Sequence, residues 1–257
     1  MLLLRATNLP YPRLKAAVLL GFATLALSAC SDSSEPGAQG GTGANAADSA
    51  ELPAIPIMGE EIRILAFGDS LFAGYGLDPE ESYPARLEAA LRARGINAAM
   101  TNAGVSGDTS AAGAQRLGFT LDELDEKPDL VILELGGNDL LRGLSPAETR
   151  ANFDEMLSEL GRREIPVLLM GMRAPPNYGV EYQSAFDAIY GDLAETYDAA
   201  LIPFWLEGIY QDQSLFQRDR IHPTAEGIEE LVSSTLDQVQ TALPEPQRAA
   251  ARATADS

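Results

Sequence analysis

The chain has 257 residues, 46% of them hydrophobic, which is enough to bury the core of one ordinary α/β domain. It carries 38 acidic and 18 basic residues, so its formal net charge is −20. We expect no nucleic-acid partner, because binding nucleic acid requires a basic surface that displaces phosphate counterions. Repulsion between such acidic surfaces also favours a soluble monomer.

The start of the chain has the pattern of an export signal. A basic leader precedes an apolar run at residues 16–27, which fits the core of a signal peptide and is short for a membrane span. The next residues, Leu27-Ser28-Ala29-Cys30, resemble the lipobox of bacterial lipoproteins, in which the cysteine is diacylated and becomes the new N-terminus. We therefore expect residues 1–29 to be a lipoprotein signal peptide, with an ordinary cleaved signal peptide as the alternative.

Cys30 is the only cysteine, so an intramolecular disulfide and a four-cysteine zinc site are excluded. Lipidation there implies an exported protein anchored to a membrane and facing the periplasm. Ser31 follows the cysteine where an aspartate would suggest retention at the inner membrane, which favours the outer membrane. Residues 30–59 are predicted to be the lipidated cysteine and a flexible linker, because small and polar residues dominate them, and residues 244–257 a disordered tail.

The remaining segment, residues 60–243, alternates short apolar runs with longer stretches of helical period, which is typical of βαβ units around a parallel sheet. Strands are predicted at residues 62–67, 96–100, 130–135, 167–171 and 201–203. Helices are predicted at residues 83–94, 111–124, 146–163, 180–197 and 224–243. Ser82 and Ser145 stand where helix N-caps are expected. The sequence thus predicts an α/β fold whose ligand site lies at the carboxyl ends of five strands.

A candidate nucleophile and base follow from two segments. The first predicted strand runs into Gly68-Asp69-Ser70-Leu71, which places a serine on a tight turn at the sheet edge. A serine hydroxyl needs a base at neutral pH, and His222 is the only histidine. Asp219, three residues upstream, can accept the Nδ1 proton and leave Nε2 free for the serine. We expect Ser70, His222 and Asp219 to form a catalytic triad.

Candidate oxyanion donors follow the next two strands. Residues 102–109 contain glycines whose backbone N–H groups can approach a substrate, and Gly136-Gly137-Asn138-Asp139 offers the side-chain amide of Asn138. Each loop alone is ordinary turn chemistry. Their order along the chain, each after a strand or before the last helix, is the stronger signal.

These segments match, in order, the four blocks of the GDSL, or SGNH, hydrolase family. Residues 134–143 and 173–179 resemble its periplasmic thioesterase, lysophospholipase and arylesterase branch, and the resemblance extends from residue 61 to residue 243. It implies a three-layer α/β/α sandwich with a five-stranded, mainly parallel sheet of the flavodoxin-like SGNH type, and no cofactor or metal. It also implies an acyl-enzyme on Ser70, and an oxyanion hole made by the N–H groups of Ser70 and Gly104 with the amide of Asn138.

The substrate is less closely defined by the sequence. Met172, Tyr178 and Trp205 are candidates for lining an acyl groove, although such aromatic residues equally often pack a core. The branch accepts small acyl esters, lysophospholipids and acyl-CoA. Because the domain is acidic and exported, we rank carboxylic esters, lysophospholipids included, above thioesters.

Two alternatives remain open at this point. An envelope polysaccharide O-acetyl esterase would use the same blocks with a smaller acyl pocket, and a chain-length series of p-nitrophenyl esters would distinguish it. A non-catalytic surface lipoprotein would bind a ligand or partner without turnover, and it would not react with a fluorophosphonate probe.

Overall fold

Five parallel strands form the central sheet of this protein. The computed structural model describes residues 57–244; the predicted signal peptide, Cys30, most of the predicted linker and the tail lie outside them. The strands are β1 (Met58–Gly68), β2 (Ile96–Gly104), β3 (Leu130–Glu134), β4 (Val167–Met170) and β5 (Ala200–Ile202). Their spatial order is β2-β1-β3-β4-β5, and every neighbouring pair is parallel. The predicted strands are therefore confirmed.

One boundary differs from the prediction. Met58 and Gly59, assigned to the linker, belong to β1, because Met58 already pairs with Ile96 of β2 ahead of a register shift. The prolines at 53 and 56 and the glycine at 59, which are typical of a linker, give no indication of this extension in the sequence.

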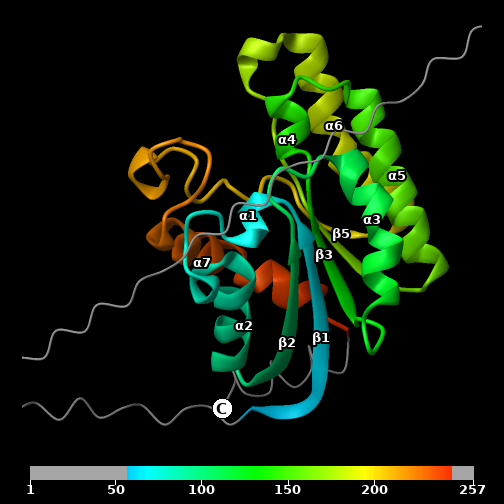
Figure 1. The fold of residues 1–257 in the computed structure, drawn as a ribbon, viewed down its shortest axis with the longest axis vertical. Helices are drawn as coiled ribbons and strands as arrows, with labels where there is room; N and C mark the ends of the chain where they lie inside the picture. The colour runs from blue at the N-terminus through cyan, green and yellow to red at the C-terminus, as the bar shows by residue number, and fades with distance from the viewer. Residues whose placement is uncertain (1–56, 245–257) are drawn as a thin grey trace, which may run out of the picture. The chain divides into compact units, whose positions relative to one another are not determined.

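Seven α-helices are described in residues 57–244: α1 (Ser70–Ala73), α2 (Tyr83–Ala93), α3 (Ser110–Asp122), α4 (Gly137–Leu141), α5 (Pro146–Arg162), α6 (Val180–Tyr197) and α7 (Ala225–Ala242). Three 3-10 turns accompany them, at Pro79–Glu81, Pro176–Tyr178 and Gln213–Leu215. Helices α2 and α7 lie on one side of the sheet, and α3, α5 and α6 on the other (Figure 1). The expected α/β/α sandwich is confirmed. The two short helices, α1 and α4, span four and five residues, too few for a helical period to predict.

Side-chain caps fix the starts of three of the five long helices. Ser82, Thr109 and Thr224 each accept a hydrogen bond from a backbone N–H in the first turn of α2, α3 and α7. Ser145 occupies the N-cap position of α5, as predicted, but its side chain makes no capping bond. Pro146 at the first helical position, with its φ already near the helical value, fixes this start instead.

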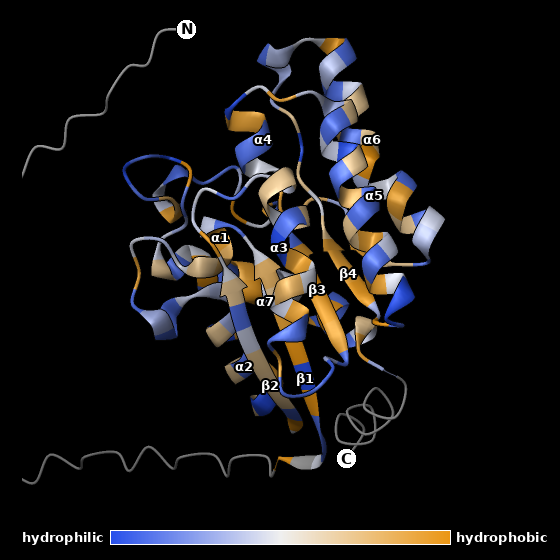
Figure 2. Cartoon of the chain, turned by 45° about the vertical axis from the view of Figure 1, so that its right-hand side comes forward, coloured by the Kyte–Doolittle hydropathy of each residue, from blue (hydrophilic) through white to orange (hydrophobic). Residues whose placement is uncertain are grey.

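The core lies between the sheet and its two helical layers. All five residues of β3 are buried, which is the pattern of a parallel strand covered on both faces. Figure 2 shows the apolar residues concentrated on the strands, with hydrophilic residues on the outer helix faces. No helix within residues 57–244 has both the length and the apolar content needed to span a membrane.

Candidate active site

The predicted site residues meet where the strand order reverses. In the sheet, β1 lies between β2 and β3, so the strands that follow it along the chain are placed first on one side of it and then on the other. In parallel sheets a crevice opens at such a point, at the carboxyl ends of the strands. Gly68, the last residue of β1, is paired with Gly104 of β2 and Glu134 of β3. Ser70 follows as the first residue of α1, and Asn138 follows β3 in the first turn of α4.

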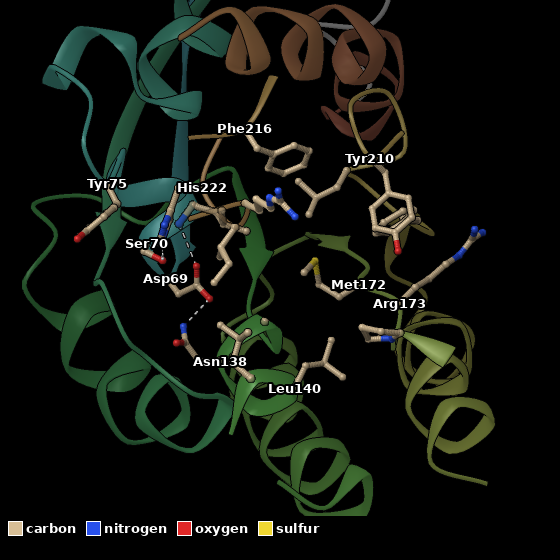
Figure 3. A pocket seen from close by; sticks show the side chains of 18 of the residues that line it. Asp69, Ser70, Tyr75, Asn138, Leu140, Met172, Arg173, Tyr210, Phe216 and His222 are labelled. Atoms are coloured by element: carbon tan, nitrogen blue, oxygen red, sulfur yellow. Dashed lines mark hydrogen bonds between the residues drawn. The ribbon is translucent and has the colours of Figure 1, made fainter. Parts of the chain in front are cut away.

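The serine, histidine and aspartate are in hydrogen-bond contact. His222 Nε2 lies 2.9 Å from Ser70 Oγ, and His222 Nδ1 lies 2.8 Å from Asp219 Oδ2 (Figure 3 shows the serine contact). Burial raises the pKa of Asp219, but the hydrogen bonds from His222 and from the N–H of Ile221 outweigh it and lower this pKa to about 2. Asp219 is therefore ionised at neutral pH, so Nδ1 donates to it and Nε2 accepts from the serine hydroxyl.

The base and its acid share one tight loop. Gln217 N–H donates to the carbonyl of His222 at 2.7 Å and closes the loop, while Arg220 turns it with a φ of +61°. Asp219 Oδ1 also accepts the N–H groups of Ile221 and His222 at 2.9 and 3.1 Å. These bonds hold the carboxylate against the imidazole independently of the rest of the site.

A neighbouring contact was not anticipated from the sequence. The ring of Tyr75, 52% exposed, lies beside the His222 imidazole with centroids 4.3 Å apart. Gln217 Nε2 donates to the carbonyls of Tyr75 and Pro223, at 2.7 and 2.9 Å. It therefore connects the loop after α1 to residues 217–222, the histidine loop. Residues so far apart in the chain carry no local pattern that would pair them.

Of the three predicted oxyanion donors, Ser70 and Asn138 line the cavity, whereas the placement of Gly104 contradicts its prediction. Gly104 does not line the cavity, and its N–H donates to Asn102 Oδ1 at 2.9 Å. A Cβ at Gly104 would stand 2.4 Å from the backbone nitrogen of Ala73, so this glycine allows β2 to pack closely against α1. Gly107, three residues later, lines the cavity with a φ of +88°. It replaces Gly104 as the candidate donor.

Three N–H groups are available to a substrate oxygen at this edge. Within residues 57–244, the backbone N–H groups of Ser70 and Gly107 donate to no other group. Asn138 Nδ2 donates one hydrogen to Asp69 Oδ2 at 2.9 Å, which leaves its second hydrogen available (Figure 3).

A cavity of about 700 Å³ opens beside the triad. Met172 and Tyr178 line it, as expected, and so do Phe204, Leu206 and Tyr210 of the aromatic-rich stretch after β5, which the sequence also indicated. Further apolar lining comes from Leu140, Leu141 and Phe216, which the sequence did not single out; Figure 3 labels Leu140, Met172, Tyr210 and Phe216. The prediction for Trp205 is wrong. Its side chain is 1% exposed and packs edge-on against Phe72 and Tyr83, because the segment after β5 turns this ring into the core.

The basic residues around the cavity differ from those elsewhere. Among the described residues, Arg142, Arg173, Arg218 and Arg220 form no ion pair, whereas every other described arginine pairs with an Asp or Glu. Arg173 and Arg220 line the cavity, and Arg142 donates to the carbonyl of Gly107 at 2.7 Å. The cavity is thus lined by unpaired cations in a chain whose net charge is −20. No group of three or more His, Cys, Asp and Glu side chains in residues 57–244 is placed to hold a metal.

Comparison with known proteins places this geometry in context. The GDSL-like Lipase/Acylhydrolase family matches residues 66–229. Esterase TesA of Pseudomonas aeruginosa is 44% identical over 160 residues, covering 62% of this chain and 79% of that protein. Thioesterase 1/protease 1/lysophospholipase L1 of Escherichia coli K12 is 39% identical over 160 residues, covering 62% and 74%. The crystal structure of AlinE4, a SGNH-hydrolase family esterase, is 65% identical with a TM-score of 0.62, covering 73% of this chain and 100% of that one.

Proposed function

Because the chain belongs to the GDSL-like lipase/acylhydrolase family, we propose that it is a serine esterase acting on carboxylic and thio esters of acyl chains. Ser70 is the nucleophile, His222 the general base and Asp219 the group that orients the base. The observation that carries this assignment is the continuous line of hydrogen bonds from Asp219 through the imidazole to the serine hydroxyl.

The reaction follows from the positions of these groups. Ser70 Oγ attacks the acyl carbon as Nε2 of His222 takes its proton, and negative charge develops on the carbonyl oxygen. The N–H groups of Ser70 and Gly107 and the amide of Asn138 stabilise that charge. The imidazolium then protonates the leaving alcohol or thiol. Water repeats the sequence on the acyl-enzyme and releases the acid.

Three alanine variants test the triad. Ser70→Ala and His222→Ala should each remove nearly all turnover of p-nitrophenyl butyrate, since no second histidine exists to replace the base. Asp219→Ala should retain more, because the Asp219 side chain is 38% exposed and water can partly solvate the imidazolium in its place. Ser70→Ala should no longer be labelled by a fluorophosphonate probe, whereas alanine variants of surface serines should be labelled like wild type. Substantial hydrolysis by His222→Ala would contradict the mechanism.

The size of the cavity bears on the acyl chain. About 700 Å³ lined by Met172, Leu140 and Phe216 accommodates a medium acyl chain, whereas an O-acetyl esterase needs room for two carbons only. We therefore favour acyl esters over polysaccharide O-acetyl groups. Rates should rise from acetyl to longer p-nitrophenyl esters, and a maximum at acetyl would favour the polysaccharide esterase.

The unpaired arginines bear on the leaving group. Arg173 and Arg220 at the cavity offset locally the acidic charge of the chain, so a phosphate on the leaving group is favourable there. We favour lysophospholipids as substrates for this reason. Arg220→Gln should raise KM for lysophosphatidylglycerol and leave KM for a p-nitrophenyl ester of equal chain length unchanged. Arg150→Gln, which removes an ion pair with Asp192 away from the cavity, is the matched control.

The location of the enzyme is a separate part of the proposal and rests on the sequence. Cys30 lies outside the described residues, and its Leu-Ser-Ala-Cys context supports lipidation, a periplasm-facing membrane anchor and, with Ser31, the outer membrane. A monomer is expected from the charge. Mass spectrometry of protein from the native host should find acyl groups on Cys30, and high salt should not release the protein, because the anchor is hydrophobic. A soluble protein without acyl mass would make it a simple secreted esterase.

A further inference from the structure

A buried carboxyl group contacts Asp69, the residue that binds the amide of Asn138. Glu134 is the last residue of β3 and the only acid in that otherwise apolar strand, and its side chain is 0% exposed. Its Oε2 accepts the N–H of Asp69 at 3.3 Å, across the register that pairs Glu134 with Gly68. Its Oε1 has no hydrogen-bond partner among the described residues. Glu134 has no part in the acyl-transfer steps above.

Asp69 connects this carboxyl group to the site. Its side chain is 2% exposed, and both of its oxygens are used. Oδ1 accepts the N–H of Leu71 at 3.0 Å and so caps α1, the helix that begins with Ser70. Oδ2 accepts Nδ2 of Asn138 at 2.9 Å. The orientation of the Asn138 amide is therefore set by the position of the Asp69 carboxylate.

Two adjacent buried carboxyl groups do not both carry charge. Burial, followed by the charge of Asp69, raises the pKa of Glu134 well above its usual range. Burial also raises the pKa of Asp69, but the hydrogen bonds from Leu71 and Asn138 oppose that rise. The unpartnered Oε1 agrees with this difference, because an ionised oxygen left without a donor in the core is far more costly than a neutral one. Glu134 is the neutral acid and Asp69 the anion.

We propose that Glu134 is a positioning residue that holds Asp69 by its backbone N–H and so, through the Asp69 carboxylate, aligns the Asn138 amide with the carbonyl oxygen of the substrate. The inference rests on the proposed function, since it takes Asn138 as an oxyanion donor. A neutral acid suits the place: its Oε2 accepts the Asp69 N–H, and it adds no second negative charge near the oxygen where charge develops. An apolar residue would fill the same space and leave Asp69 without this partner.

Two variants separate hydrogen bonding from packing. Glu134→Gln keeps the shape, the neutral state and an oxygen that accepts the Asp69 N–H, so kcat should stay within about threefold of wild type. Glu134→Met keeps approximate length but offers the Asp69 N–H no oxygen, and it should lower kcat about 10- to 100-fold with KM nearly unchanged. Thr235→Val is the matched control, because it removes a buried hydrogen bond to Tyr83 between α2 and α7. It should lower the melting temperature and leave kcat unchanged.

A double-mutant cycle identifies the route of the effect. In an Asn138→Ala background, Glu134→Met should lower kcat no further, since the residue through which Glu134 acts is already gone. Equal losses in the two backgrounds would overturn the inference, as would Glu134→Gln losing as much as Glu134→Met. Failure of the proposed function has a different signature, which is turnover surviving in Ser70→Ala.

An infrared measurement keeps the inference testable even if Glu134→Met does not fold. The difference spectrum between wild type and Glu134→Gln at neutral pH should contain the carbonyl stretch of a protonated carboxyl group. Absence of that band would mean that Glu134 is ionised, and the inference would fail.

Discussion

Replacing Asn138 with alanine removes two hydrogen bonds of different kinds. One is present in the resting enzyme, where Nδ2 donates to the buried Asp69 at 2.9 Å. Its loss leaves a buried carboxylate oxygen short of a donor, which costs about 1–3 kcal/mol of folding free energy. The other forms as charge develops on the substrate oxygen, and its loss costs about 2.7–4 kcal/mol of transition-state stabilisation, or about 10²- to 10³-fold in kcat.

The two losses are read by separate assays. Steady-state kinetics on p-nitrophenyl butyrate should show the fall in kcat with KM nearly unchanged, and thermal unfolding should show a melting temperature several degrees lower. Asn138→Asp should be worse in both assays, because it places a second carboxylate beside Asp69. Asn152→Ala is the control, since Asn152 also donates from its amide, to Ser110 at 2.9 Å, but outside the cavity. A change confined to KM would reassign Asn138 to substrate binding and refute the reasoning.

Three further predictions concern stability and shape. The pKa of Asp219 is lowered from 3.8 to about 2, so its contacts with His222 stabilise the fold fully above pH 3.8 and lose that effect as the pH falls toward 2. The difference in urea midpoint between wild type and Asp219→Asn should therefore shrink over this pH range. A constant difference would contradict the assignment. Trp205→Phe should lower the melting temperature but leave chain-length preference unchanged, whereas an altered preference would return Trp205 to the acyl groove. Gly136→Ala should lower both kcat and the melting temperature, because the new Cβ would stand 2.2 Å from the Tyr190 hydroxyl and the backbone has a φ of +102°. Wild-type values of both would show that this loop is not tightly packed.

Periodicity in the sequence was sufficient to predict the sheet and the five long helices. Apolar runs of the right length bounded by turn residues leave few alternatives, and Ser82 marked its helix start correctly. The triad was predictable for another reason. A lone histidine three residues after an acid, with a serine directly after a buried strand, leaves one combination to consider.

The errors arise where the choice depends on packing across the chain. Gly104 ends β2 and Gly107 lies only three residues later, and the contact of Gly104 with α1 and the position of Gly107 at the cavity distinguish them. Trp205 follows β5 in a segment that also contains cavity residues, and its direction depends on the pocket left by Phe72 and Tyr83. Glu134 did carry a signal, since an acid in a run that must be buried requires a partner. The partner itself became visible only in the register of β1 against β3.

The proposed triad is divided between two segments of the chain, the histidine loop and the segment at the start of α1 that carries Ser70. Asp219 and His222 are bound to each other within the loop closed by Gln217, while Ser70 is fixed to the sheet by α1. The two segments are connected by the contact of the imidazole with Ser70, by its packing beside Tyr75, and by the hydrogen bond from the Gln217 side chain to the carbonyl of Tyr75. Warming should therefore separate these two segments before it unfolds the core, since opening the loop exposes far less apolar surface than unfolding the sheet. Activity should accordingly be lost on warming before the fold melts, and a stronger contact between the two segments should extend catalysis toward the melting temperature.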